Sequence, residues 1–219
     1  MNYQLMKDAV DLIKEFENTN FESKQYSGDV NGFKQWMLKT FTAETFTPEP
    51  DWEGKANGRS PESVINTLIV HMNRYAKNYS KSAIYGSEFS TQEDFIYLIN
   101  LKAFGNMTKM ELIKKNIQDK PVGMQTINRL IEQGWVKQQD SETDKRSKVI
   151  SITPKGLKAL EKQMDKIRQA THVVTGDLTH TEKMELIRLL DKLNDFHNPL
   201  YNQNLEPEKL LEEALKSKN

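Results

Sequence analysis

Cysteine is absent from the 219 residues of this chain. Disulfide frameworks and zinc sites with cysteine ligands are therefore excluded. Long hydrophobic runs are also lacking, since no apolar stretch approaches the ~20 residues that a membrane-spanning helix needs. The first residues do not contain the apolar core of a secretory signal. We therefore expect a soluble cytoplasmic protein that has no membrane partner.

An excess of charge of one sign is lacking too, because 31 lysines and arginines balance 31 aspartates and glutamates. DNA-binding proteins often carry a basic surface, and the chain as a whole does not supply one. From Lys109 to Lys148, however, nine basic residues against six acidic residues leave a local charge of +3. This local excess predicts moderate, salt-sensitive binding to nucleic acid.

Signatures of catalysis are missing as well. The sequence has no phosphate-binding glycine loop, no nucleophile elbow and no His-Glu-x-x-His helix. Its four histidines include no pair at the close helical spacing of a metal site. We therefore predict that the protein is not an enzyme and has no metal or cofactor.

The most informative stretch runs from residue 108 to residue 156. Thr108 and Glu111 form a capping box, which predicts the start of a short helix. A second helix is predicted to begin near Asp119, with Pro121 in its first turn, and to end at Gly134. The apolar residues of the second helix recur at helical spacing and predict one buried stripe. They are Met124, Ile127, Leu130 and Ile131.

A β-hairpin is predicted directly after these two helices. Residues 135–139 and 147–152 are the expected strands, and the charged residues 140–146 form a long polar tip. Helix, turn, helix and hairpin in this order make a winged helix-turn-helix arrangement. A helix fits the major groove of DNA, and a basic loop beside it can reach the backbone or the minor groove.

This stretch resembles the DNA-binding lobe of the MarR family of bacterial transcription regulators. Four motifs lie in register over about fifty residues, a combination that is much more specific than any one of them. They are Thr108/Glu111/Leu112, Leu130/Gly134/Val136, Asp144/Arg146 and Thr153/Gly156. One departure is that Gln138 and Gln139 stand where the family often has basic residues. The resemblance implies a homodimer and a small-molecule pocket between the dimerisation helices and the DNA lobe.

The predicted fold is mainly α with a small β-wing, and the length favours one elaborated domain over two. Residues 1–58 are expected to form an N-terminal helical extension and residues 59–88 a dimerisation and linker helix. Residues 89–153 are the winged helix-turn-helix lobe, and residues 154–219 are a C-terminal helical dimerisation region.

Helix boundaries are predicted from caps and apolar spacing. Residues 1–18 are expected to form an amphipathic helix, followed by a polar linker over 18–28, a short helix near 33–41 and a loop over 48–58. A long helix starts at Ser60-Pro61 and is apolar over most of its circumference. This pattern predicts that other parts of the protein pack against the helix from two sides. Ser90 to Glu93 form a capping box for the next helix. After the wing we expect helices from 154 to Gly176, from 180 to Pro199, and over 207–216.

The second helix of the lobe, about residues 120–133, is the predicted recognition helix. Glutamine pairs with adenine, arginine pairs with guanine, and valine contacts a thymine methyl group. The candidate base-reading residues are Val122, Gln125 and Arg129, with Lys120 and Asn128 at the edges. Alternatively, these are ordinary exposed residues of a surface helix. Arg129, late in the helix, could instead contact a phosphate or brace the fold.

The predicted wing covers about residues 140–148. An arginine at a wing tip can enter a narrow minor groove, where the electrostatic potential is most negative. Arg146 is the candidate for this role, and Lys145 and Lys148 are candidates for phosphate contacts.

A ligand site is expected on the long helix that starts at residue 60. A cationic side chain beside tyrosines could hold a small aromatic acid. The candidates are His71, Arg74, Tyr75 and Tyr79. The alternative is that these residues are core tyrosines and a hydrogen-bonded histidine.

Together these observations predict a dimeric regulator, a repressor, that reads a palindromic site in double-stranded DNA and is released by a small molecule. The competing hypothesis is a winged-helix module that binds proteins without sequence-specific DNA binding. The neutral overall charge and the two wing glutamines keep that hypothesis open.

Overall fold

A computed structural model describes residues 3–41, 49–140 and 148–218 of the chain. The chain divides into two compact units, Met1–Ser60 and Pro61–Asn219, rather than forming one elaborated domain. Among the described residues, no helix has the length and apolar character needed to cross a membrane.

The first unit is a pair of helices, α1 (Tyr3–Ser23) and α2 (Val30–Phe41), followed by a short 3-10 helix, η1 (Lys55–Asn57). Aromatic rings hold the pair together, because Phe16 lies 5.4 Å from Phe33 and 5.6 Å from Trp36 between ring centroids. Helix α1 continues past residue 18, so the prediction of a linker from residue 18 was wrong over its first residues. The loop predicted over 48–58 contains η1.

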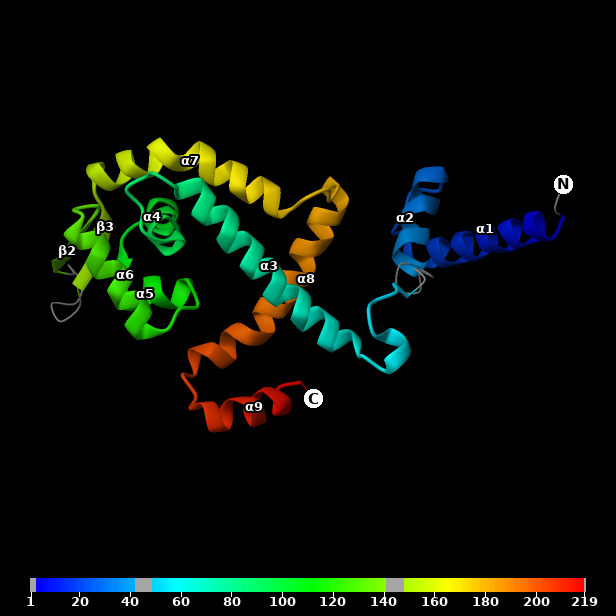
Figure 1. The fold of residues 1–219 in the computed structure, drawn as a ribbon. Helices are drawn as coiled ribbons and strands as arrows, with labels where there is room; N and C mark the ends of the chain where they lie inside the picture. The colour runs from blue at the N-terminus through cyan, green and yellow to red at the C-terminus, as the bar shows by residue number, and fades with distance from the viewer. Residues whose placement is uncertain (1–2, 42–48, 141–147, 219) are drawn as a thin grey trace. The chain divides into compact units, whose positions relative to one another are not determined.

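The second unit contains the remaining elements (Figure 1). They are α3 (Pro61–Ile84), α4 (Gln92–Phe104), β1 (Met107–Thr108), α5 (Lys109–Lys115), α6 (Lys120–Glu132), β2 (Val136–Asp140), β3 (Lys148–Ile152), α7 (Pro154–Val174), α8 (His180–Asn202) and α9 (Pro207–Lys216). Helix α3 packs along α7, and α4 to β3 form the lobe at the end of this pair. The predicted mainly α fold with a small β-wing is confirmed.

Three antiparallel strands form the sheet of the lobe, in the order β1-β3-β2. Val136 is opposite Ile152, and Met107 is opposite Ile150. Strands β2 and β3 are the predicted hairpin. Strand β1 was not predicted, because two residues are too few to give the alternating pattern that marks a strand.

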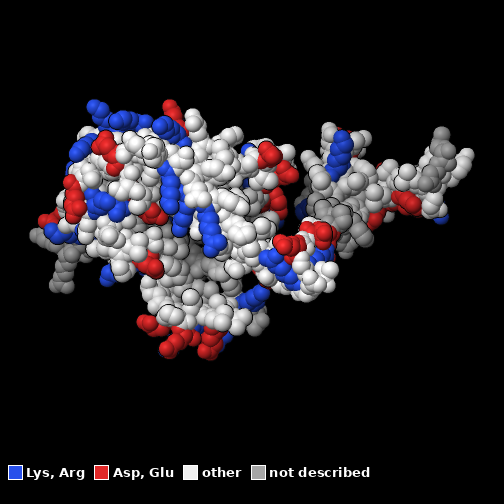
Figure 2. Space-filling view, viewed as in Figure 1, with Lys and Arg blue, Asp and Glu red and all other residues white. Residues whose placement is uncertain are grey.

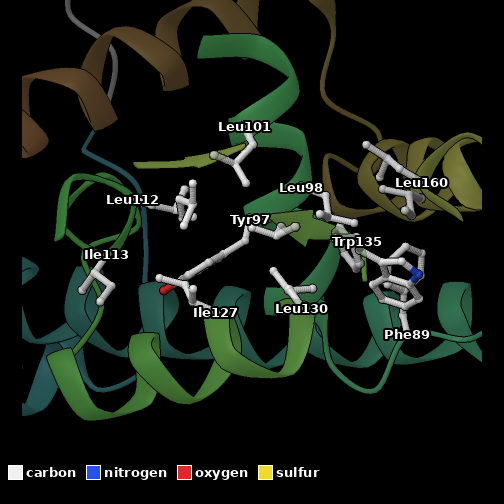
Figure 3. Close-up of a cluster of buried hydrophobic side chains, with 14 of the residues drawn as sticks. Phe89, Tyr97, Leu98, Leu101, Leu112, Ile113, Ile127, Leu130, Trp135 and Leu160 are labelled. Carbon is white, nitrogen blue, oxygen red and sulfur yellow. The ribbon is translucent and has the colours of Figure 1, made fainter. Parts of the chain in front are cut away.

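The core of the lobe is a continuous apolar cluster (Figure 3). Leu98 of α4, Leu112 of α5 and Ile127 of α6 are each completely buried. Trp135, after the end of α6, packs its ring 5.0 Å from that of Phe89. The predicted inward faces of α5 and α6 are therefore confirmed, and the two helices are fixed on α4.

Two helix ends differ from the predicted ones. The capping box of α4 is formed by Thr91 and Asp94 rather than by Ser90 and Glu93. Helix α8 runs through Pro199 to Asn202, although a proline was expected to end it. Pro199 cannot donate a backbone hydrogen bond, and burial of the next residue, Leu200, offsets this loss.

Candidate nucleic-acid interface

Helix α6 has one buried side and one exposed side. Asp119 is its N-cap residue, Pro121 lies in its first turn, and Gly134 follows it with a left-handed φ of 70°, as predicted. Thr126, Ile127 and Leu130 face the core. Four of the predicted DNA-binding residues on this helix are exposed: Lys120, Val122, Gln125 and Asn128. The helix therefore presents a mixed polar and apolar face to the solvent.

The preceding helix α5 is fixed by its cap. The Thr108 hydroxyl accepts a hydrogen bond from the Glu111 amide at 3.1 Å, and the Glu111 carboxylate accepts one from the Thr108 amide at 2.6 Å. These hydrogen bonds stabilise the charged form and lower the pKa of Glu111. The predicted capping box is confirmed, and it sets where α5 begins.

Glycine at position 123 allows α6 to lie directly on the rest of the lobe. A Cβ atom built at Gly123 would lie 3.0 Å from the Tyr97 hydroxyl oxygen and would overlap the side chain of Ile113. The close approach leaves no room for a larger residue here. The exposed face of α6 is therefore set by helix-to-helix contact and not by its loops alone.

Arg129 takes part in a network that sequence reasoning did not find. Its Nε donates to Asp94 Oδ1 at 2.9 Å and its Nη2 donates to the same oxygen at 2.5 Å. Asp94 is 1% exposed, and its other oxygen accepts the backbone amides of Ser90 and Thr91. The guanidinium also donates to the Thr91 hydroxyl at 3.1 Å. These contacts favour the bracing alternative for Arg129, because its donors are directed at α4.

The wing contributes one described candidate. Lys148 forms an ion pair with Asp140 at 3.3 Å across the hairpin, and both side chains are well exposed. Such a pair is weak and leaves the ammonium group available to a phosphate. Lys145 and Arg146, like Asp144, lie outside the described residues. Figure 2 shows basic side chains over the end of the second unit that carries the lobe, with acidic side chains among them.

The ligand candidates all lie on α3. The rings of His71 and Tyr75 are 6.4 Å apart, so the structure brings these two together. Tyr75 is 53% exposed and Tyr79 is 40% exposed, and Arg74 is exposed as well. In the single chain, the two tyrosines are therefore surface residues and not core residues.

Comparison with known proteins identifies the lobe. A model of the MarR family matches residues 90–147, which include α4, α5, α6 and β2. This lobe belongs to the MarR family. The resemblance drawn from the four sequence motifs is thereby confirmed.

Individual relatives agree with this assignment. The chain is 29% identical over 126 residues to an uncharacterised HTH-type transcriptional regulator, YwoH, from Bacillus subtilis, a match that covers 55% of this chain and 90% of YwoH.

Two solved structures share the fold of about two thirds of this chain. A MarR variant from E. coli in complex with operator DNA has a TM-score of 0.56 and 21% identity, and covers 66% of this chain and 99% of its own. BpsR from Bordetella bronchiseptica has a TM-score of 0.57 and 20% identity, and covers 67% of this chain and 99% of its own. About a third of this chain thus lies outside each match.

Proposed function

We propose that the chain is a transcriptional repressor that binds a palindromic operator in double-stranded DNA as a homodimer. The observation that carries the proposal is the exposed face of α6, where Val122, Gln125 and Asn128 lie together in a MarR-family lobe. These side chains can contact the edges of bases in the major groove. Lys120, Lys145, Arg146 and Lys148 supply the phosphate and minor-groove contacts of the proposal.

The proposed dimer is supported by apolar surface on the helices outside the lobe. Many large apolar side chains of α3 and α8 are between 38% and 54% exposed in the single chain. They include Ile65, Leu68, Met72 and Tyr75 on α3 and Met184, Ile187 and Leu190 on α8. Exposed apolar surface of this extent is typical of an interface. A second copy would cover it and would place two α6 helices on half-sites roughly one turn of DNA apart.

Replacing Gln125 with alanine is expected to weaken binding to the operator about tenfold and to relax base preference at one position of each half-site. The reason is that a bidentate contact between glutamine and adenine contributes about 1–3 kcal/mol of discrimination. Fluorescence anisotropy with operator duplexes that differ at single positions measures both effects.

The matched control is Gln133→Ala, because Gln133 is an exposed glutamine at the C-cap position that follows the same helix. It is expected to keep the affinity and base preference of the unaltered protein. Equal losses in the two variants, or no loss at Gln125, would contradict base reading by α6. An unaltered protein that binds a protein partner but no duplex would favour the protein-interaction hypothesis.

We further propose that a small aromatic acid binds against α3 and releases the DNA. The support is the group of His71, Arg74, Tyr75 and Tyr79 on one helix, together with the reported regulation of BpsR DNA binding by 6-hydroxynicotinic acid. An aromatic carboxylate could stack on a tyrosine while its charge is held by the arginine. Isothermal calorimetry with a panel of phenolic acids is expected to detect binding that Arg74→Ala weakens. No detectable heat of binding at millimolar concentrations of phenolic acid would refute the hypothesis for this class of ligand.

A further inference from the structure

The turn between α5 and α6 contains a strained residue. Ile117 has a φ of +48°, a left-handed conformation that is a genuine outlier for a β-branched side chain. The turn is closed by the Ile117 amide, which donates to the Lys114 carbonyl at 3.0 Å, and by the Gln118 amide, which donates to the Ile113 carbonyl at 3.2 Å. A strained residue persists only where surrounding contacts hold it in place.

One such contact comes from far along the chain. The Tyr201 hydroxyl, at the end of α8, donates to the Gln118 carbonyl oxygen at 2.9 Å. Gln118 directly follows the strained residue and directly precedes Asp119, the N-cap of α6. Leu200 beside Tyr201 is only 5% exposed, so the last turn of α8 is packed and not frayed. This contact fixes the backbone at the point where the recognition helix begins.

Helix α8 meets the lobe through its last turn. A groove of about 620 Å³ lies between the C-terminal part of α8 and the lobe, lined by Asn194, Asn198 and Asn202 on one side and by residues that include Lys114 and Ile117 on the other. Within the described ranges, the hydrogen bond of Tyr201 is the one that links α8 to the lobe. Earlier residues of α8, such as Ile187 and Leu190, belong to the exposed apolar face assigned to the dimer.

A second tyrosine lies against the first turns of α6. Tyr97 of α4 is 1% exposed, and its hydroxyl has no hydrogen-bond partner among the described residues. Burial, with smaller contributions from Glu93 and Tyr201, raises the pKa of Tyr97 to about 12. The Tyr97 hydroxyl also limits the space at Gly123 in the first turns of α6. Tyr201, Tyr97 and the start of α6 therefore form one packed neighbourhood.

We propose that Tyr201 is a positioning residue for DNA recognition, which holds the strained turn at Ile117 and so fixes the start of α6 relative to the dimerisation helix α8. The inference rests on the proposed function. One end of α8 contacts the lobe, and its middle belongs to the proposed dimer interface. The Tyr201 hydrogen bond therefore couples the packing of the two subunits to the direction of each recognition helix.

Tyr201→Phe removes the hydroxyl and keeps the ring. We expect operator affinity to fall about fivefold, the net effect of one hydrogen bond, with an unchanged salt dependence because no phosphate contact is lost. In the DNA-free protein, hydrogen exchange at residues 117–124 is expected to become faster while the core of the lobe stays protected. The matched control is Tyr85→Phe, since Tyr85 is 86% exposed, and it should change neither readout.

A second variant tests the link to the strained turn. Asparagine tolerates a left-handed φ better than isoleucine, and Ile117 is 51% exposed, so Ile117→Asn should fold. In an Ile117→Asn background, Tyr201→Phe is expected to change hydrogen exchange and operator affinity less than it does in the unaltered protein. An effect of equal size in both backgrounds, or unchanged exchange in Tyr201→Phe, would overturn the proposal. Failure of the unaltered protein to bind DNA would refute the proposed function instead. Hydrogen exchange at residues 117–124 would then still show whether Tyr201 holds the strained turn.

Discussion

Asp94→Ala is expected to lower the free energy of unfolding of the second unit by about 3 kcal/mol, the lower end of the range for breaking a buried ion pair. The carboxylate is 1% exposed, accepts two backbone amides at the start of α4 and pairs with Arg129 of α6. Its removal takes away a helix cap and leaves a partly buried guanidinium without its charge partner. Urea denaturation followed by circular dichroism measures the change.

A double-mutant cycle separates the cap from the ion pair. Arg129→Ala alone should lower the free energy of unfolding less than Asp94→Ala does, because the two backbone amides still donate to the carboxylate. The loss of stability in the double variant should be smaller than the sum of the losses in the two single variants. Asp191→Ala, an exposed aspartate on α8, is the control and should be nearly neutral. Additive losses would show that Arg129 and Asp94 do not act together, and Arg129 would return as a candidate for base reading.

Gly156→Ala is expected to lower the free energy of unfolding by about 2–3 kcal/mol. A Cβ atom at this position would overlap the Trp135 carbonyl oxygen and lie 3.0 Å from the Trp135 carbonyl carbon. The obstacle is backbone, which cannot rotate away. The Trp135 carbonyl also accepts the Thr153 amide at 2.9 Å, and the Thr153 hydroxyl donates to the Gly134 carbonyl at 2.7 Å. Added volume here would force the start of α7 away from the wing.

Gly28→Ala is the control for this prediction, because nothing lies within 4 Å of a Cβ atom built at Gly28 and its φ is not left-handed. It should leave the unfolding transition where it is. A Gly156→Ala protein as stable as the unaltered one would mean that α7 can shift at little cost, and the contact with Trp135 would then not explain why glycine stands there.

Local signals were sufficient to predict most of the lobe from the sequence. The capping box at Thr108, the proline in the first turn of α6 and the glycine at position 134 each act within a few residues of where they lie. The structure adds a reason for the Thr153/Gly156 motif, because both residues meet the backbone around Trp135. Their spacing could be recognised in the sequence, but the contact they serve could not.

What the sequence did not reveal depends on residues that are distant along the chain. The pairing of Arg129 with Asp94 spans 35 positions, and that of Tyr201 with Gln118 spans 83. Pro199 was expected to end α8, but packing of Leu200 keeps the helix intact for one more turn. The one local signal for Asp94 is its position three residues after Thr91, a capping-box spacing that is shifted by one residue from the predicted pair Ser90 and Glu93.

Selection of bound sequences from a pool of random duplexes tests the central claim most directly, namely that α6 of two subunits reads DNA. The account predicts an enriched palindrome with half-sites about one helical turn apart, and loss of one enriched base pair per half-site when Gln125 is replaced by alanine. A pool without an enriched motif, or a motif that Gln125→Ala leaves unchanged, would contradict it.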